Sequence, residues 1–544
     1  MSQRVITVPE ARAIDNYVIS SGIYDEAMLI EQVARGVYHY LVDADLLTSD
    51  SRDITLLIGT GNNGGDGLSL ARLLYAHGVP LRLVYTGAPK KESVNHALRT
   101  MIAGLNIQSL GLDDSDALTS CLDQSSCIID ACIGIGNNRP LAGTYAWLIE
   151  QANSSNAVRI AIDVPTGIFE GVDRTSTVFS AHTTLSIGHR KTILYLPEAR
   201  TYCGEIEDIW TPFLSPGRIR NIKVEPSGLG SIGQKDTEGY EQSRSKRKKS
   251  FFDTTQGQEK YTLFSCSDLP ELVISPGKKS HKHSRGSVLI CAGSQDMPGA
   301  AHLCSGAATL SFAGVVYLLK DEIGSSEDGD LRVETPWQQI LLSLHPSILL
   351  TEDIKRPYSA IVVGPGWKTE KTSLFSRIIR EDQPIVLDAD AFWYCKNEID
   401  TMSARSAPTI LTPHPKECAR LLDIGVEEVL KNPVRSGQEL SERYNAIVVV
   451  KGHVTHIVDH DQIAIIDGLC PALACAGSGD VLAGIIAGCL ATQDDAYRAV
   501  IAGTLAHLKI GKEFQSQGIF PSADWFLKRI PFVFSPEIVE CCSC

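Results

Sequence analysis

The chain has 544 residues, with 50 lysine and arginine residues against 64 aspartate and glutamate residues, so its formal net charge is −14. This acidic balance argues against a nucleic-acid coat protein or a polybasic membrane protein. Hydrophobic residues make up 43% and charged residues 21% of the chain, which excludes wholesale disorder and collagen-like structure. The length allows two large α/β domains or three to four smaller ones.

The apolar segments and the cysteines predict a soluble, cytoplasmic protein. The best candidate for a membrane span, residues 481–492, is rich in glycine and alanine and falls short of the roughly 18–20 residues that a bilayer needs. The first ten residues contain no apolar signal core. Most of the fifteen cysteines stand singly in apolar segments, and only residues 541–544 are cysteine-dense. This is typical of buried thiols in a reducing compartment.

The first half of the chain repeats a pattern of strand, turn and helix. Short apolar runs that end near Gly, Asp or Pro predict buried parallel strands; they lie at 54–58, 81–85, 127–129 and 158–162. Residues 68–76 follow the first run with the apolar spacing of a helix. The pattern predicts a doubly wound α/β domain that binds its ligand at the carboxyl ends of the strands.

A glycine-rich loop follows the first of these strands. Five of the nine residues from Gly59 to Gly67 are glycines, so the backbone amides can approach an anion at the start of a helix. The loop differs from the dinucleotide fingerprint G-x-G-x-x-G and lacks a Walker lysine. Its density of Asn, Gly and Asp favours a ligand-binding loop over a plain tight turn.

Two further strands of the first half end in an acidic residue. Asp130 begins the segment DACIGIG, and Asp163 begins DVPTG. A carboxylate at such a position can bind a ribose hydroxyl, hold a cation or act as a base, whereas either alone could also cap a helix. Together with the glycine loop they converge on one crevice.

GNNGGDG, DACIGIG and DVPTG, in this order, resemble the N-terminal epimerase domain of the bifunctional NAD(P)H-hydrate repair enzymes over about residues 1–222. The resemblance implies a Rossmann-like fold, a potassium ion near Asn63, Asp130 and Thr166, and a catalytic Asp163. It also implies a set of residues that bind the hydrated nicotinamide nucleotide: Asn62, Asn63, Gly64, Gly65, Asp66, Gly134, Ile135, Gly136, Asn137, Asn138, Arg139, Pro140 and Asp163. The family's LMENAG segment reads LIEQVA at 29–34, which leaves the strength of the epimerase activity open.

Residues 223–261 differ in composition from both halves. They contain few aliphatic residues and many small polar ones, with a basic run at 244–249. Such a segment cannot bury enough apolar surface to offset its chain entropy. We therefore predict a flexible linker between a first domain at 1–222 and a second at 262–544.

The second half shows the same alternation, and its most informative motif is AGSGDVLAG at 476–484. Four strands are predicted, at 287–291, 360–363, 384–387 and 447–450. Gly477 and Gly479 present backbone amides at a helix start, with Asp480 beside them. Such a nest can stabilise transferring phosphoryl oxygens while the carboxylate accepts a proton from the attacking hydroxyl. The alternative is that Asp480 is an ordinary N-cap.

HK at 281–282, GPG at 364–366, DAD at 388–390, TPHP at 412–415, KGHVT at 451–455 and GSGD, in this order, resemble the ribokinase-like dehydratase domain of the same family over about residues 262–510. The resemblance implies that Ala300, Gly366, His414 and Asp480 contact the hydrated cofactor, Asp480 as a catalytic residue. It further implies a set that binds the adenine nucleotide: Lys451, Gly452, His453, Val454, Thr455 and Gly479. Departures from the family pattern occur at Trp367 and Lys416.

The function implied is the repair of hydrated nicotinamide cofactors. The first domain would interconvert the R and S hydrates, NADHX and NADPHX. The second would dehydrate the S hydrate with Mg²⁺ and ADP, releasing AMP and phosphate; ATP as donor and a homo-oligomer stay open. One alternative is a ribokinase-like small-molecule kinase with an N-terminal binding domain. Another is a scaffold whose basic linker contacts RNA, although no nucleic-acid partner is expected.

Overall fold

The structure, a computed structural model, describes residues 2–47, 53–209, 260–274, 280–282, 284–320, 336–368 and 371–534. The chain divides into two compact units, whose described parts are 4–209 in the N-terminal unit and 260–534 together with residues 2–3 in the C-terminal unit. The predicted linker at 223–261 lies outside the described residues except at its end, where strand β9 begins at Tyr261. The limits of the domains and of the linker therefore stay predictions.

The N-terminal unit is built on a parallel sheet of seven strands. Its order is β4-β3-β2-β5-β6-β7-β8, and each neighbouring pair is parallel. The strands are β2 (Ile54–Ile58), β3 (Leu81–Tyr85), β4 (Gln108–Leu110), β5 (Cys127–Ala131), β6 (Val158–Ile162), β7 (Thr183–Ile187) and β8 (Glu205–Ile209). A two-residue strand, β1 (Gln3–Arg4), precedes them in the chain.

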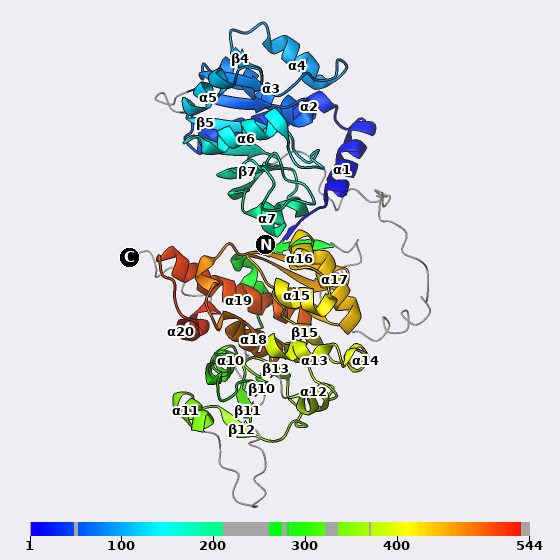
Figure 1. Ribbon diagram of the computed structural model, residues 1–544, viewed down its shortest axis with the longest axis vertical. Coiled ribbons are helices and arrows are strands. Elements are labelled where there is room, and N and C mark those ends of the chain that lie inside the picture. Colours follow the sequence, from blue (N-terminus) through cyan, green and yellow to red (C-terminus); the bar gives the residue numbers. More distant parts are fainter. Residues whose placement is uncertain are drawn as a thin grey trace, which may run out of the picture. The chain divides into compact units, whose positions relative to one another are not determined.

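Helices flank both faces of this sheet (Figure 1). They are α1 (Val8–Ser20), α2 (Glu26–Asp43), α3 (Asn62–Ala76), α4 (Val94–Ile102), α5 (Ser115–Asp123), α6 (Gly143–Ser154) and α7 (Pro197–Arg200). Successive side chains of a strand point to opposite faces: Leu56 packs with α2 and α3, and Leu57 packs with α5 and α6. Burial on both faces explains why the strands are continuous apolar runs.

The strand order reverses beside β2. The chain runs outward from β2 through β3 to β4, then returns to β5 on the other side of β2 and continues outward to β8. Ligands of open α/β sheets bind at such a switch point, outside the carboxyl ends of the strands. The glycine loop after β2 and Asp130 at the end of β5 both lie there.

The C-terminal unit has a larger, mixed sheet, which runs β9-β18-β17-β16-β15-β14-β13-β10-β11-β12. Only the pairs β16–β17 and β17–β18 of this series are antiparallel. The strands are β9 (Tyr261–Phe264), β10 (Ser287–Cys291), β11 (Val315–Leu319), β12 (Leu349–Thr351), β13 (Ala360–Val363), β14 (Ile385–Leu387), β15 (Thr409–Leu411), β16 (Ile447–Val450), β17 (Val454–Asp459) and β18 (Gln462–Asp467). The order reverses between β10 and β13.

Two helical layers cover this second sheet as well (Figure 1). One layer packs α10 (Pro298–Leu310), α18 (Ser478–Leu490), α19 (Ala496–Ser516) and α20 (Ala523–Val533) on one face. The other face carries α12 (Thr372–Ile378), α13 (Phe392–Cys395), α15 (Pro415–Leu422) and α17 (Pro433–Tyr444). Shorter helices complete the unit: α9 (Leu269–Leu272), α11 (Pro336–Leu344), α14 (Ile399–Ser403) and α16 (Val426–Lys431).

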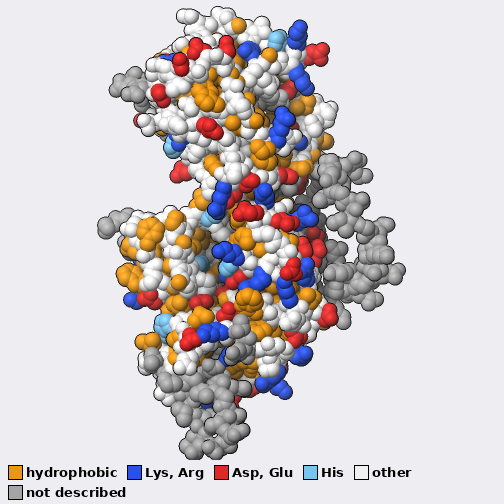
Figure 2. Space-filling model, viewed as in Figure 1, with side chains coloured by type: hydrophobic (Ala, Val, Ile, Leu, Met, Phe, Trp, Pro, Cys, Tyr) orange, Lys and Arg blue, Asp and Glu red, His pale blue; other side chains and the backbone are white. Residues whose placement is uncertain are grey.

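The predicted α/β class with two doubly wound domains is confirmed. Seven of the eight predicted strands have the expected start, and the eighth, predicted at 384–387, begins at Ile385 instead of Pro384. The twelve described cysteines are free thiols, and none of the helices in the described ranges is long and apolar enough to cross a bilayer. On the face shown in Figure 2, acidic and basic side chains are interspersed over both units.

Candidate active sites

The glycine loop of the N-terminal unit has a shape that only glycine permits. A Cβ atom at Gly59 would lie 1.8 Å from the carbonyl oxygen of Cys132, and one at Gly64 would lie 2.1 Å from the carbonyl oxygen of Gly59. The Asn95 amide donates hydrogen bonds to the carbonyl oxygens of Gly59 (3.1 Å) and Gly61 (2.7 Å). Gly61 is the N-cap of α3 and offers no side-chain cap, so the first amides of the helix face a possible anion.

A buried carboxylate network joins the ends of β5 and β6. Asp130, which is fully buried, accepts hydrogen bonds from the backbone amides of Cys132 (3.0 Å) and Thr166 (2.8 Å) and from the Thr166 hydroxyl (2.8 Å). Burial raises the pKa of Asp130 to about 6 despite these hydrogen bonds. At the start of α3, which follows β2, the strand paired with β5, both amide atoms of the Asn63 side chain are buried and have no hydrogen-bond partner among the described residues.

Asp163 follows β6 in the left-handed backbone region, with φ = 71°. Its carboxylate forms an ion pair with the Lys191 ammonium at 2.5 Å and accepts a long hydrogen bond (3.4 Å) from the amide of Ile135. A Cβ atom at Gly134 would lie 2.8 Å from the same carboxylate. A strained backbone of this kind at a non-glycine residue is typical of functional sites.

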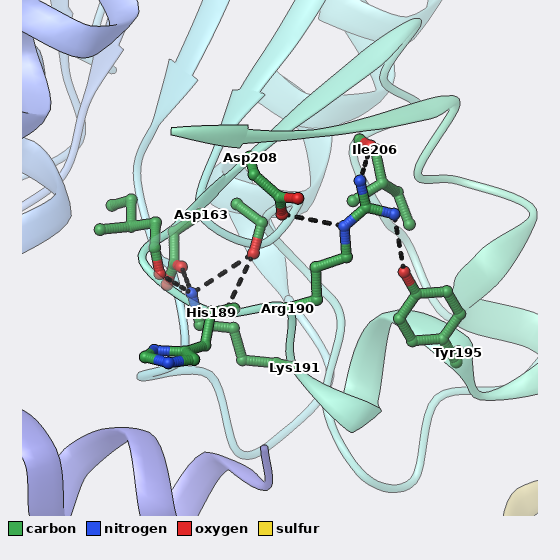
Figure 3. Close-up of polar contacts among 9 residues, drawn as sticks. Asp163, His189, Arg190, Lys191, Tyr195, Ile206 and Asp208 are labelled. Atoms are coloured by element: carbon green, nitrogen blue, oxygen red, sulfur yellow. Dashed lines mark hydrogen bonds and ion pairs between the residues drawn. The ribbon is translucent and has the colours of Figure 1, made fainter. Parts of the chain in front are cut away.

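Lys191 is the partner that holds Asp163 in place (Figure 3). It is only 3% exposed, and its ammonium also donates to the carbonyl oxygen of Ile187 at 2.7 Å. The preceding residue, Arg190, fixes the segment by donating to Asp208 (2.8 Å) and to the carbonyl oxygen of Ile206 (2.8 Å). The pair Asp163–Lys191 is therefore built rigidly.

Asp163, Lys191 and part of the glycine loop line one cavity of about 790 Å³, which is within the usual size range of small-molecule sites. Side chains of α1 and α2, the glycine loop, the segment 132–136 and the segment 187–191 contribute to its wall. The polar residues that line it are Arg12, Asp15, Asn16, Glu26, Thr60, Asn62, Asn63, Asp66, Thr86, Tyr145, Asp163, His189 and Lys191. It thus combines the glycine loop with acids and a lysine.

The C-terminal unit gathers its charged groups where β14, β15 and β16 end. The Lys451 ammonium forms an ion pair with Asp388 at 2.8 Å, and the Asp388 side chain is 2% exposed. The Thr412 hydroxyl donates to the same carboxylate at 2.7 Å. A Cβ atom at Gly479 would lie 3.4 Å from the Lys451 nitrogen, so the ion pair packs against the start of α18.

Helix α18 begins on a glycine in the left-handed region. Gly477 is its N-cap, with φ = 87° and no side-chain cap, and Asp480 stands in the first turn rather than at the cap. The alternative that Asp480 is an ordinary N-cap is therefore wrong. Burial, followed by the charge of Asp388, raises the pKa of Asp480 to about 7, although Lys451 opposes the shift.

The beginning of α18 is also held from behind. The Ser478 hydroxyl shares a hydrogen bond of 3.0 Å with Nε2 of His507 on α19. Burial, together with the charge of Lys451, lowers the pKa of His507 to about 4, so this ring is neutral at physiological pH. A neutral, buried partner can fix the hydroxyl without adding charge to the site.

Comparisons with known proteins match both units of the chain. A family model described as NAD(P)H-hydrate dehydratase matches residues 288–526, and one described as YjeF-related protein N-terminus matches residues 26–193. The bifunctional NAD(P)H-hydrate repair enzyme Nnr of Thermosynechococcus vestitus is 30% identical over 537 residues, 95% of each chain. The chain belongs to the family of bifunctional NAD(P)H-hydrate repair enzymes. The predictions of the family, of an enzyme and of cofactor repair are confirmed.

Other relatives are similar. The Nnr enzyme of Coxiella burnetii is 27% identical over 514 residues, 92% of each chain. Among solved structures, an ADP/ATP-dependent NAD(P)H-hydrate dehydratase from Bacillus subtilis, co-crystallised with ATP and Mg²⁺, is 25% identical; the match covers 50% of this chain and 97% of that chain, with a TM-score of 0.43. Because the match to the repair enzymes spans both units, the kinase alternative is not favoured.

The structure of this repair enzyme brings together part of the predicted epimerase set. Asn62, Asn63, Asp66, Gly134, Ile135, Gly136 and Asp163 line the cavity. Gly64 and Gly65 lie in the first turn of α3, where a Cβ atom at Gly65 would lie 2.9 Å from Ile30; these two glycines permit close packing. Asn137, Asn138, Arg139 and Pro140 continue the 132–136 segment beyond the residues that line the cavity.

In the dehydratase unit the predicted residues form two groups. Gly366 and Ala300 meet at the switch point, since a Cβ atom at Gly366 would lie 2.7 Å from that of Ala300. Lys451 and Gly479 adjoin Asp388, and the Val454 side chain is buried, so Val454 can meet a nucleotide only through its backbone. His414 is the N-cap of α15, where its Nδ1 accepts from the amide of Lys416 at 3.1 Å.

Several residues that the structure places at these sites were not predicted from the sequence. Lys191 follows β7, a strand that was not predicted, and it stands 28 residues after Asp163 in the chain. The sequence around it, IGHRKT at 187–192, is polar and gave no sign that this lysine would be buried. Asp15 and His507 lie on helices whose pattern gave no reason to single out one polar residue.

Proposed function

We propose that the 790 Å³ cavity of the N-terminal unit is the epimerase site for the hydrated nicotinamide nucleotide. The glycine loop 59–67 would take the phosphates through its amides, as helix starts do. Asn62, Asn63, Asp66, Gly134, Ile135 and Gly136 would contact the ligand from the cavity wall, and residues 137–140 would extend the contact outside it. Asp163 would act as the acid or base that transfers a proton during epimerisation of the hydrate. The buried Asp163–Lys191 pair in this cavity is the observation that carries the proposal.

A potassium ion fits the neighbouring polar groups. Asn63 has a buried amide oxygen without a described partner, Thr166 offers a hydroxyl, and Asp130 carries a buried carboxylate whose pKa burial raises to about 6. A cation would relieve the cost of that buried charge, and hard oxygen ligands suit such a cation. We propose that Asn63, Asp130 and Thr166 hold potassium, whose charge would fix the strand ends beneath the ligand.

We propose that the C-terminal unit dehydrates the S hydrate at the start of α18. Asp480 would accept the proton of the hydrate's hydroxyl while the amides of 477–479 stabilise the transferring phosphoryl oxygens. Lys451, Gly452, His453, Val454, Thr455 and Gly479 would hold the nucleotide, and Ala300, Gly366 and His414 the hydrated cofactor. The raised pKa of Asp480, about 7, suits a base that works near neutral pH.

The donor in this proposal is ADP, which would leave as AMP and phosphate, and ATP is the alternative. Mg²⁺ neutralises phosphoryl charge when it is bound. Among the described residues no cluster of three or more His, Cys, Asp or Glu side chains could hold a metal ion by itself. The metal would therefore be held mainly by the phosphates, with few carboxylates, as is common for Mg²⁺.

The test is a repair assay on a mixture of R and S hydrates with Mg²⁺ and either ADP or ATP. We expect both epimers to be consumed, the R hydrate faster than spontaneous epimerisation allows. This result requires both units to be active. Consumption of the S hydrate alone would contradict the epimerase proposal, and accumulation of a stable phosphoester would favour the kinase alternative. The RNA-scaffold alternative concerns a basic run outside the described residues. Cytoplasmic location and homo-oligomerisation stay predictions.

A further inference from the structure

Helix α1 places one acid, Asp15, in the wall of the epimerase cavity. The helix is fixed at its start by the capping box of Thr7 and Glu10. Its neighbouring residue Ile14 belongs to a buried cluster with Leu29 of α2. One turn earlier, the guanidinium of Arg12 donates to the carbonyl oxygen of Ile135 at 2.8 Å, which ties α1 to the 132–136 segment. These contacts fix the position of α1, and with it the position of Asp15 in the cavity wall.

Several charged or titratable groups line the same cavity as Asp15. These groups are Asp66 on α3, Glu26 on α2, Tyr145 on α6, Asp163, His189 and Lys191 after the strand ends, and Arg12 on α1 itself. Burial, and then the charge of Asp163, raises the pKa of Asp15 to about 6, while Lys191 lowers it. The two acids thus differ in their partners: Asp163 has the lysine as a direct ion-pair partner, whereas no such partner holds Asp15 among the described residues. Burial and neighbouring carboxylates raise the pKa of Asp15 and also that of the buried Asp66 on α3.

We propose that Asp15 is the proton donor of the epimerisation and that Asp163 is the matching proton acceptor. The inference rests on the proposed assignment of this cavity to the hydrated nucleotide. It adds a second catalytic residue, on an element that none of the motifs includes. An epimerase that removes and replaces a hydroxyl needs an acid and a base at one carbon, and two carboxyl groups in different environments can supply both.

The step balances in protons and electrons. Water adds to an enamine at the carbon bonded to nitrogen, so the hydroxyl of the hydrate is on such a carbon. Asp15 gives its proton to that hydroxyl as the carbon–oxygen bond breaks, and the bond's electron pair leaves with the oxygen as water. The lone pair of the ring nitrogen forms a planar C=N bond. Water then adds to the other face and loses its proton to Asp163. The reverse epimerisation starts with Asp163 protonated and Asp15 ionised, which is the state that the forward step leaves behind.

Asp15→Asn is the informative variant because it keeps the shape and removes the proton donor. The assay follows a mixture enriched in the R hydrate, without nucleotide, so that the dehydratase site is idle. We expect kcat for epimerisation to fall by about 10²–10⁴-fold with KM near the parent value. The kcat/KM of the parent should fall as pH rises above about 6, because Asp15 loses its proton, and this limb should vanish in the variant.

Asp163→Asn is measured beside it, with the double variant. Because the two acids act in one step, the double variant should be no slower than the slower single variant. Asp15→Asn should melt no lower than the parent, since burial and Asp163 both disfavour the ionised Asp15, and S-hydrate dehydration should be unchanged. Three results would overturn the inference: a parent-like kcat, a rise in KM alone, or a lowered melting midpoint with loss of activity. A parent that fails to epimerise would instead refute the proposed function of the cavity.

Discussion

Two carboxylates, the buried Asp163 in one unit and the partly buried Asp480 in the other, lie near a lysine at the carboxyl edge of a sheet, but their relation to that lysine differs. In the N-terminal unit Lys191 contacts Asp163 directly, at 2.5 Å. In the C-terminal unit the lysine, Lys451, is paired with Asp388, and Asp480 stands next to that pair. Asp163 thus forms a direct ion pair with its lysine, whereas Asp480 lies near a lysine that is already paired with another carboxylate.

The difference shows how the surroundings of a carboxylate set its pKa or its orientation. For Asp480, burial and the negative charge of Asp388 raise the pKa to about 7, and Lys451 offsets only part of this shift. A carboxylate in this state can accept a proton near neutral pH and release it again. For Asp163, the direct ion pair fixes the orientation of the carboxylate against Gly134 and Ile135. The arrangement of partners, more than the residue type, separates the two sites.

Removing Asp480 should have the largest effect. We expect Asp480→Asn to lower the rate of S-hydrate dehydration by about 10²–10⁴-fold, because a general base is lost. Nucleotide affinity should stay within a few-fold, since the backbone amides of 477–479 and Lys451 remain. The measurement is single-turnover dehydration with nucleotide binding on the same preparation. The exposed Asp494→Asn is the matched control, and a parent-like rate in Asp480→Asn would refute the base assignment.

Removing Lys191, the lysine paired directly with Asp163, should have the next largest effect. Lys191→Met leaves Asp163 buried without its cation, and breaking such a pair typically costs about 3–5 kcal/mol. We expect that loss in the free energy of unfolding of the N-terminal unit, together with loss of epimerisation. Chemical denaturation is the measurement. Adding Asp163→Asn should restore part of the stability, because the uncompensated charge is gone; a double variant that is less stable than Lys191→Met would contradict this account.

The comparison also shows which parts of the molecule the sequence could reveal. Buried strands such as β2 and β10 were predicted with their limits because both of their faces are covered, which makes the whole run apolar. Asp163 and Asp480 were found because glycines and strand ends surround them in the chain. Lys191 was not, because its partner is 28 residues away and only the pairing of β6 with β7 brings the two together.

Edge and antiparallel strands gave a weaker signal. β17 and β18 form a hairpin with polar residues among the apolar ones, and β4 is exposed along most of its length. Residues such as Asp15 and His507 could not be singled out for a related reason: a polar residue on an amphipathic helix is ordinarily solvent-facing, and only the tertiary structure turns it into a cavity wall or a buried pair. The sequence thus predicted sites made from local motifs but not those assembled across elements.

The pH dependence of dehydration tests the state of Asp480 with a smaller effect. A base must be deprotonated to act, so kcat/KM should rise with pH and level off above the pKa of about 7. Below that value it should fall by about tenfold per pH unit. The same profile measured on Asp480→Asn should lack this limb. A parent profile that stays flat between pH 5.5 and about 8 would show that Asp480 is not the titrating base.

A third carboxylate, Glu31 of α2, also has direct cationic partners, but these arginines are partly exposed to solvent. We therefore expect a smaller effect when its charge is removed. It accepts hydrogen bonds from the Ser69 hydroxyl (2.6 Å) and from Arg72 (2.6 Å) on α3 and forms an ion pair with Arg35 (3.1 Å). Burial opposes its ionisation, yet the hydrogen bonds from Ser69 and Arg72 lower its pKa overall. Glu31 lies in the LIEQVA segment that departs from the family pattern, and it joins α2 to the helix that carries the glycine loop.

Glu31→Gln keeps an acceptor for Ser69 but removes the charge that Arg72 and Arg35 meet. Because solvent screens these arginines, we expect a loss of only about 1 kcal/mol in the free energy of unfolding and an epimerisation rate close to the parent. A carboxylate whose pKa is lowered in the folded state stabilises it above the unfolded pKa, and this contribution is lost as the pH falls through the folded pKa. The difference between parent and variant, followed by denaturation, should therefore be present at pH 7 and shrink as the pH falls below the ordinary glutamate pKa of 4.5. A difference that matches that of Lys191→Met would mean that burial does not decide how much a direct cation partner contributes.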